Sequence, residues 1–340
     1  RIEQHPVNIG CVAYMFGIKP KTLYYWYKEY LSDYRKQIAE GKWGDKKILV
    51  ADKDTGEVIK EKPVPIAKPE NMGSRMTIDE KWIGKKMYTL MTNVETGKIA
   101  LLAQSHDGEE LQQVIENYFS EKQQEVKSVS SDMNATYKKL CKQMFPNSQI
   151  VIDKFHVITH LLDALQQVRK EIKNEWLNNP RLQVNPVSLE NHEQEEEWTE
   201  IEFLERSRYT LCKNEIDWEQ EETSMMNDLF SHYPTLKKAY ELTQKLREWY
   251  DKKYIGVNRD FRERDLDDWC DDVVQSKIPA FRAVRKMIEK HHDDIVNYFK
   301  EGHTNAKAEN MNGKIQRFLA NNFGIRNRDF FFFRLAGYFS

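Results

Sequence analysis

The alternation of apolar and polar residues predicts a β-sheet in the first half of the chain. Short runs that alternate, or that are apolar throughout, predict five strands at residues 76–83, 86–94, 98–104, 126–131 and 149–153. The second and third are joined through Glu95-Thr96-Gly97, which is typical of a hairpin turn. Apolar positions at helical spacing predict two helices between the later strands, at residues 109–122 and 135–144. This order predicts an α/β fold in which helices flank a mixed sheet, as in a ribonuclease-H-like layout.

The second half of the chain has helical spacing and no convincing strand. Helical segments are predicted at residues 157–177, 225–254 and 278–299, with an acidic stretch between the first two. A further helix is predicted from Asn305, and a last one carries four consecutive phenylalanines from Phe330. We therefore expect a large all-α insertion, followed by two helices that return to the sheet domain.

Two short helices are predicted near the start of the chain, between residues 7 and 36. They are separated at Gly17 and the second begins at Pro20, which is typical of a helix-turn-helix DNA-binding unit. Ala13 is small where the helices would cross, and Ile18, Leu23 and Trp26 have the spacing of a shared core. An ordinary helical hairpin is the alternative. In a DNA reader the outward residues of the second helix would contact phosphates and base edges, namely Lys19, Lys21, Thr22, Tyr24, Tyr25 and Lys28.

The predicted elements divide the chain into five segments. These are a helix-turn-helix domain (1–40), a linker or small hairpin region (41–75), the first part of the core (76–156), the all-α insertion (157–302), and the C-terminal core helices (303–340).

Composition is that of a soluble globular protein, with 40% hydrophobic and 31% charged residues. No run approaches the roughly 18 apolar residues that span a membrane, so a cytoplasmic protein is expected. No secretory leader is visible, although the chain opens at Arg1 and a segment can precede it. The formal net charge of −2 conceals a division between an acidic stretch (190–222) and a basic C-terminal region. A DNA-binding face is compatible with that division.

The cysteines are widely separated and form no C-x-x-C pair, which argues against a zinc ribbon or a disulfide framework. We expect all four to be reduced thiols in the core: Cys11, Cys141, Cys212 and Cys270.

Three acidic residues are placed where a metal site can form. Asp79 lies in the first strand, Asp132 follows the fourth, and Glu309 lies in the helix after the insertion, so all three can converge on one edge of the sheet. Oxygen donors of this kind suit Mg²⁺. Acidic residues also occur at strand ends simply because they are soluble. For each of the three residues taken alone, this is the alternative explanation. Glu80 adjoins Asp79, but successive strand residues point to opposite faces, so only one of the two can readily reach the site.

The sequence around these residues is more specific. The segments TIDEK, SSDMNATY, FPNSQIVIDKFHV and NAKAENMNGKIQ, in this order, resemble the transposases of ISL-group insertion sequences and their Bacteroidetes relatives, over Met76 to Ser340. The resemblance implies a DDE metal triad of Asp79, Asp132 and Glu309 that holds two Mg²⁺ ions, for which Mn²⁺ can substitute. It also supports the N-terminal helix-turn-helix. Many ISL-group members carry a cysteine zinc module before that unit, and this chain has no such cysteines.

The resemblance implies an activity as well. The partner would be double-stranded DNA, bound at terminal inverted repeats in the bacterial nucleoid, and the reaction would be strand cleavage followed by strand transfer. Pairing of two ends implies a homodimer on DNA. A domesticated DNA-binding regulator and a structure-specific nuclease are the alternatives.

Other residues are candidates for supporting roles. Asp153 and His156 follow the fifth strand and are predicted either to lie near the metals or to be structural, through a salt bridge or hydrogen bonds. Asn305 is a natural N-cap of the Glu309 helix, and Asn312 follows Glu309 on the same face, where it can order metal-bound water. Phosphate contacts, or merely a solvated basic face, are expected of Lys314, Arg317, Arg326 and Arg328.

Overall fold

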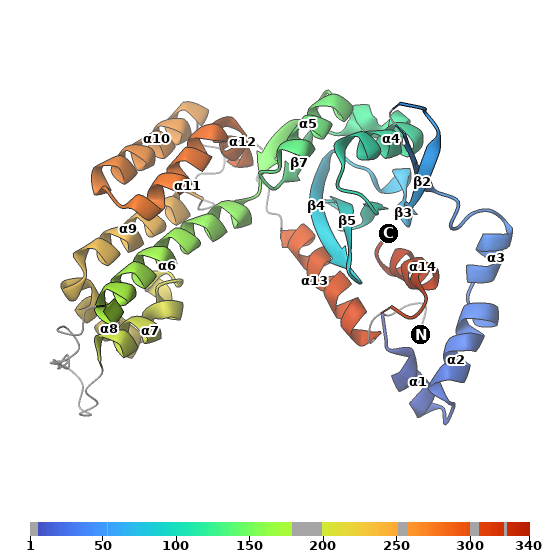
Figure 1. The fold of residues 1–340 in the computed structure, drawn as a ribbon, viewed down its shortest axis with the longest axis horizontal. Helices are drawn as coiled ribbons and strands as arrows, with labels where there is room; N and C mark the ends of the chain where they lie inside the picture. Colours follow the sequence, from blue (N-terminus) through green and yellow to red (C-terminus); the bar gives the residue numbers. More distant parts are fainter. Residues whose placement is uncertain (1–5, 53, 179–198, 251–257, 300–305, 323–324) are drawn as a thin grey trace. The chain divides into compact units, whose positions relative to one another are not determined.

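The computed structural model describes residues 6–52, 54–178, 199–250, 258–299, 306–322 and 325–340, except for the side chains of residues 306–310. The chain forms two compact units. The first combines Arg1–Val151 with Thr304–Ser340, and the second is Ile152–His303. Figure 1 shows the sheet and its helices in the first unit and helices alone in the second.

A mixed six-stranded sheet forms the centre of the first unit, in the order β3-β6-β5-β4-β7-β8. Its strands are β3 (Ile66–Ala67), β4 (Arg75–Ile83), β5 (Lys86–Asn93), β6 (Ile99–Ala103), β7 (Ser128–Ser131) and β8 (Gln149–Ile152). β4 pairs antiparallel with β5 and parallel with β7. The predicted α/β class and the five predicted strands are confirmed, and the arrangement is consistent with a ribonuclease-H-like fold. β3 was not predicted, because two residues are too few for any periodicity.

Helices cover both faces of the sheet. They are α4 (Gly108–Phe119) and α5 (Ala135–Met144) on one face, and α13 (Ala306–Asn321) and α14 (Arg328–Phe339) on the other. Ile78 of β4 belongs to the core that includes Leu111 and Leu140, whereas Ile83 belongs to the core that includes Met311 and Phe332. Even-numbered and odd-numbered residues of β4 therefore face different helices. Figure 1 shows α13 beside β4 although the two are far apart in sequence.

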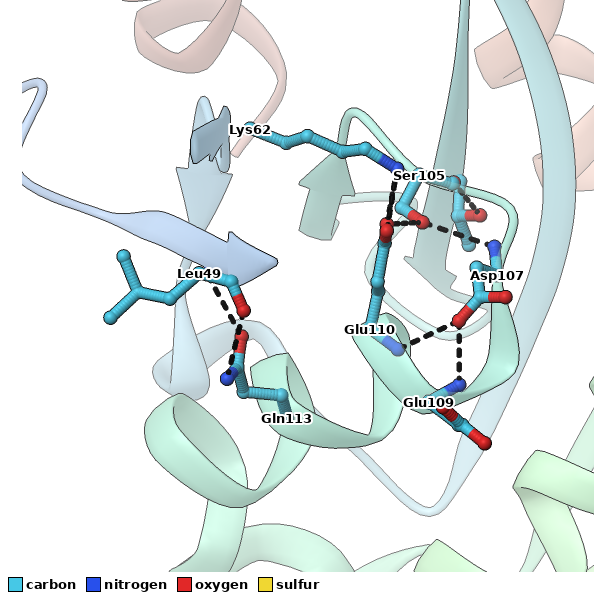
Figure 2. Close-up of polar contacts among 8 residues, drawn as sticks. Leu49, Lys62, Ser105, Asp107, Glu109, Glu110 and Gln113 are labelled. Atoms are coloured by element: carbon cyan, nitrogen blue, oxygen red, sulfur yellow. Dashed lines mark hydrogen bonds and ion pairs between the residues drawn. The ribbon is translucent and has the colours of Figure 1, made fainter. Parts of the chain in front are cut away.

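A separate two-stranded sheet contacts α4 through hydrogen bonds and an ion pair. Its strands are β1 (Lys47–Ala51) and β2 (Val58–Pro63). Lys62 of β2 pairs with Glu110 at 2.6 Å, and the same carboxylate accepts a hydrogen bond from the hydroxyl of Ser105. The side-chain oxygen of Gln113 accepts the Leu49 N–H at 3.0 Å (Figure 2). The region predicted as a linker or small hairpin is thus a hairpin attached to the sheet domain.

Short helices at the start of the chain pack against α14. They are α1 (Ile9–Met15), α2 (Pro20–Trp26), which runs on into a π-helical turn (Tyr27–Leu31), and α3 (Tyr34–Ala39). Ala13 is fully buried and Gly17 has a φ of +65°, as the predicted turn requires. The prediction that Trp26 joins the core is wrong, because its side chain is 43% exposed. Tyr27 is buried instead, since the four-residue step from Leu23 keeps it on the same helix face.

In its described residues the second unit consists of helices and the turns that connect them, apart from Ile152, the last residue of β8. It contains α6 (Lys154–Asn178), α7 (Glu200–Thr210), α8 (Gln220–His232), α9 (Pro234–Trp249), α10 (Arg259–Ser276), α11 (Pro279–Lys290) and α12 (His292–Val296). The single helix predicted over 225–254 is wrong, because α8 ends before Pro234, which lacks the N–H needed to continue a helix. The segment predicted over 278–299 is likewise interrupted, at His291. Trp249 and Trp269 are buried in the core, as predicted. None of the helices in the described part of the chain is long and apolar enough to cross a membrane.

The cysteines differ in burial, which gives a test of the packing. Cys141 and Cys270 are buried, and burial raises the pKa of each thiol to about 12. Cys11 is exposed and Cys212 is half-buried, so the prediction of four core thiols is wrong for these two. Because the thiolate is the reactive form, a thiol reagent at pH 8 should modify Cys11 first and reach Cys141 and Cys270 only after unfolding. Mass spectrometry measures the modification rate of each cysteine. Equal rates for all four would contradict this packing.

Candidate active site

Asp79 lies on the face of the sheet that α13 covers. Its Oδ1 accepts the N–H of Glu80 at 2.8 Å, and its Oδ2 accepts the side-chain N–H of Asn312 at 2.6 Å. The second bond connects the middle of β4 to α13 across 233 residues of sequence. Asn312 was predicted to support the site, and it does contact the first candidate carboxylate.

Asp132 lies at the end of β7, beside β4. The parallel register ends with the pair Ile78 and Ser131, so Asp79 in β4 and Asp132 directly after β7 both follow this pair. Neighbouring strands lie about 4.8 Å apart in a sheet. Asp132 Oδ1 accepts the N–H of Asn134 at 3.0 Å. The Asn134 side chain in turn accepts the N–H of Thr136 and caps α5. A capped helix therefore holds the turn that carries Asp132.

Glu309 lies in α13, one helical turn before Asn312. Its side chain and the predicted cap Asn305 lie outside the described residues. The structure thus brings Asp79, Asp132 and the helix of Glu309 to the same part of the sheet domain.

The residues present suit a hard cation such as Mg²⁺. Asp79 and Asp132 offer carboxylate oxygens, the ligands that Mg²⁺ prefers. The side-chain Oδ1 of Asn312 is buried and has no hydrogen-bond partner, which is costly for an amide unless a ligand or water completes it. This unpartnered oxygen lies on the side chain that bonds Asp79. The two carboxylates and this amide oxygen together suit a bound ion and the waters around it.

Glu80, which is not among the predicted ligands, has defined partners in the structure. Its Oε1 accepts hydrogen bonds from the Asn134 side chain at 3.2 Å and from the hydroxyl of Tyr137 at 3.3 Å. Both donors belong to the N-terminal end of α5, on the face of the sheet opposite to α13. The alternation of β4 predicted that Glu80 faces away from Asp79, but no sequence signal indicated what it contacts.

Asp153 and His156 belong to the helical unit, at the beginning of α6. Asp153 Oδ1 accepts the N–H of Phe155 at 3.0 Å, which satisfies a free backbone donor of the first helical turn. The backbone N–H of His156 is bonded to the Asp153 carbonyl at 3.2 Å. The structure therefore shows a helix-starting role for Asp153, and a metal role for either residue stays a prediction.

The residues predicted to read DNA differ in their exposure. Lys19, Lys21 and Tyr25 are exposed. Tyr24 is half-buried and packs edge-on against Phe330, with ring centroids 5.6 Å apart. Thr22 and Lys28 are half-buried as well. Lys28 also forms an ion pair with Glu29 at 3.0 Å.

Basic residues of α13, of α14 and of residues 325–327 just before α14 fall into two groups. Arg317 and Arg326 are exposed, and Lys314 is half-buried. Arg328 donates to the Tyr88 hydroxyl at 2.5 Å and to the Gly84 carbonyl at 3.2 Å, which fastens α14 to the β4–β5 turn. Arg326 lines a cavity of about 260 Å³ between the N-terminal helices and α14. The other lining residues of that cavity include Arg334, Asn8, Asn322 and Asn327, and none is acidic.

A second group with metal-binding residue types occurs in the helical unit. Glu263, His292 and Asp293 have ligand atoms within 4.8 Å of one another, the one such group among the described residues. Arg259 contacts Glu263 at 2.5 Å and Asp293 at 2.9 Å. A guanidinium therefore already neutralises both carboxylates, and this group is an ion-pair cluster.

Comparisons with known proteins identify the family of the chain. The family model for DDE transposases of the ISL3 type, described as "Transposase", matches residues 76–335. The transposase for insertion sequence element IS1557 of Mycobacterium tuberculosis, found in two strains, is 22% identical over 249 residues, 70% of this chain and 53% of the relative. The transposase for insertion sequence element IS1001 of Bordetella parapertussis is 19% identical over 218 residues, 64% and 48% of the two chains. No solved structure matches.

The chain spans about half the length of the curated relatives it matches. The matched residues 76–335 include all but the first residue of the β4–β8 region, with Asp79 and Asp132, and α13, with Glu309. The family model covers most of the chain, and the chain belongs to the ISL3-type family of DDE transposases.

Proposed function

We propose that the protein binds the terminal inverted repeats of a transposon, cuts DNA strands there, and joins the freed ends to target DNA, with Asp79, Asp132 and Glu309 as ligands of two Mg²⁺ ions. The observation that carries the proposal is the hydrogen bond from Asn312 to Asp79. It connects the strand of the first carboxylate to the helix that carries Glu309, so the three positions can act as one site.

The protein residues position the ligands. Asn312 fixes one oxygen of Asp79, and the α5 turn fixes one oxygen of Asp132. Helical spacing places the position of Glu309 on the same face of α13 as Asn312. Mg²⁺ ions held by these residues would lower the pKa of an attacking water or 3′-hydroxyl and stabilise the leaving oxygen.

DNA recognition is assigned to the N-terminal helices. Gly17 turns the chain between α1 and α2, and the exposed Lys19, Lys21 and Tyr25 lie at the start of α2 or on its surface. The exposed Arg317 and Arg326 would contact DNA phosphates nearer to the catalytic helix. Because two ends must be paired for joining, we propose a homodimer on DNA.

The proposed DNA interface predicts a specific salt response. Each phosphate that the protein neutralises contributes about 0.9 to the slope of log K against log [salt]. Replacing Lys19 and Lys21 together by Gln should therefore reduce the slope for end binding by about 2 and weaken binding at about 0.1 M salt by at least roughly tenfold. Fluorescence anisotropy over a salt series measures both. Lys237→Gln, an exposed lysine of α9, is the control and should leave the slope unchanged. An unaltered slope in the double variant would remove α2 from the DNA interface.

A strand-transfer assay tests the activity itself. Pre-cut ends that carry a free 3′-hydroxyl should be joined to plasmid DNA in Mg²⁺ by the wild-type protein. Cleavage of uncut ends without any joining would favour a structure-specific nuclease. Binding with neither reaction would favour a regulator.

A further inference from the structure

Glu80 lies beside Asp79 in β4 but belongs to the opposite face of the sheet. Asp79 bonds Asn312 of α13, whereas Glu80 bonds Asn134 and Tyr137 at the start of α5. Adjacent strand residues point to opposite faces, so Glu80 cannot turn towards the Asp79 site without breaking the β4 register. The hydrogen bonds of Glu80 therefore fix the start of α5.

One oxygen of Glu80 holds the turn that carries Asp132. Its Oε1 accepts from the Asn134 side chain and from the Tyr137 hydroxyl. Asn134 is also the residue whose backbone N–H bonds Asp132 Oδ1. Glu80 is thus connected to Asp132 through one residue, and the connection runs from the strand of one candidate ligand to the turn of the next.

Tyr137 makes this connection rigid. Its side chain is fully buried, and its hydroxyl is also 3.1 Å from the Thr89 hydroxyl of β5. Burial raises the pKa of Tyr137, and the Glu80 and Asp132 carboxylates raise it further. The phenol therefore stays protonated and donates its hydrogen to Glu80.

The direction of the Glu80 side chain disfavours a role as a ligand of a metal held by Asp79, because the two residues face opposite sides of the sheet. Both of its donors are neutral and both are aimed at the same oxygen. An acceptor with two fixed donors is suited to holding them in place. A neutral acceptor of the same shape would serve equally well.

We propose that Glu80 is a positioning residue: it fixes Asn134 and Tyr137, and thereby the turn that presents Asp132 to the metal. The inference rests on the proposed function, because it concerns the presentation of Asp132 as a ligand. Partners that orient ligating carboxylates typically account for about 10–100-fold in metal affinity or activity.

The test compares variants that separate the hydrogen bonds from the charge. Glu80→Gln keeps an acceptor oxygen and removes the charge, whereas Glu80→Leu removes both. Tyr137→Phe keeps the buried ring and removes one donor, so it is the second variant if Glu80→Leu does not fold. Glu116→Leu, at an exposed position of α4, is the matched control. Mn²⁺ binding followed by electron paramagnetic resonance is measured beside Mg²⁺-dependent cleavage and end binding in Ca²⁺.

Glu80→Gln should bind Mn²⁺ within about threefold of wild type and cut at a similar rate. Glu80→Leu should bind Mn²⁺ at least roughly tenfold more weakly, with kcat reduced in parallel and end binding retained, and Tyr137→Phe should show a smaller loss. A Gln variant as inactive as Asp79→Asn would overturn the proposal, since the charge would then be required. A Leu variant, or the Phe variant in its place, with unchanged Mn²⁺ binding would overturn it too.

The two proposals fail in different ways. If Asp132→Asn binds Mn²⁺ as wild type does, the metal site itself is wrong, and the role of Glu80 falls with it. If Asp132→Asn loses Mn²⁺ and Glu80→Leu does not, only the role of Glu80 is overturned.

Discussion

Asp132→Asn is expected to bind transposon ends as tightly as wild type and to leave them uncut in Mg²⁺. The amide keeps an oxygen that can accept the Asn134 N–H, so the turn before α5 is preserved. It loses the negative charge that makes a carboxylate a good Mg²⁺ ligand. We expect cleavage to fall by about 10³-fold or more, equivalent to about 4 kcal/mol less transition-state stabilisation. Glu309→Gln should behave alike.

A matched control is available in the same domain. Asp107 likewise lies in a turn before a helix, and its Oδ1 accepts the N–H groups of Glu109 and Glu110 in α4. Asp107→Asn makes the same chemical change in another turn before a helix, at a residue that is not a proposed ligand, and should cut DNA normally. Rates are measured on labelled end fragments under single-turnover conditions. Full cleavage by Asp132→Asn or Glu309→Gln would refute the assignment of the triad.

Phe330→Ala is expected to produce the largest loss of stability in the first unit. Its ring is 1% exposed and lies 5.0–5.6 Å, between centroids, from the rings of Tyr24, Tyr27 and Tyr34. Removing a buried phenylalanine ring costs about 3–5 kcal/mol. Because these partners belong to α2, the π-helical turn and α3, the N-terminal helices should detach from α14 and end binding should weaken.

Urea unfolding and limited proteolysis measure that effect. The N-terminal region up to Ala39, the end of α3, should be cleaved faster in Phe330→Ala than in wild type. Phe261→Ala removes a ring that is 46% exposed on α10, and it should change the free energy of unfolding by about 0.5 kcal/mol or less. A Phe330→Ala protein with the wild-type unfolding midpoint would show that this aromatic cluster does not hold the N-terminal helices.

Local patterns predicted most of the sheet domain. The strands around Asp79 and the helix at 135–144 follow directly from apolar spacing, since each buries one face against the same core. Contacts distant in sequence were not predictable. Trp26 and Tyr27 both fit a helical core pattern, and only the docking of α2 on Phe330 selects Tyr27.

The candidate site shows the same division. Strand alternation separated Asp79 from Glu80, and the register places Asp79 next to Asp132. The partners of these carboxylates lie on helices from elsewhere in the chain. No local sequence pattern therefore indicates the Asn312–Asp79 bond or the Asn134–Glu80 bond. Arg328, predicted to contact DNA, bonds a tyrosine hydroxyl and a backbone carbonyl for the same reason.

The most direct test of the account is the position of bound metal. Crystals of the protein with a transposon-end duplex and Mn²⁺, measured at a wavelength where manganese scatters anomalously, should show two peaks about 4 Å apart between Asp79, Asp132 and Glu309. The absence of any peak at Asp79 and Asp132, or a peak only at Glu263, His292 and Asp293, would contradict the account.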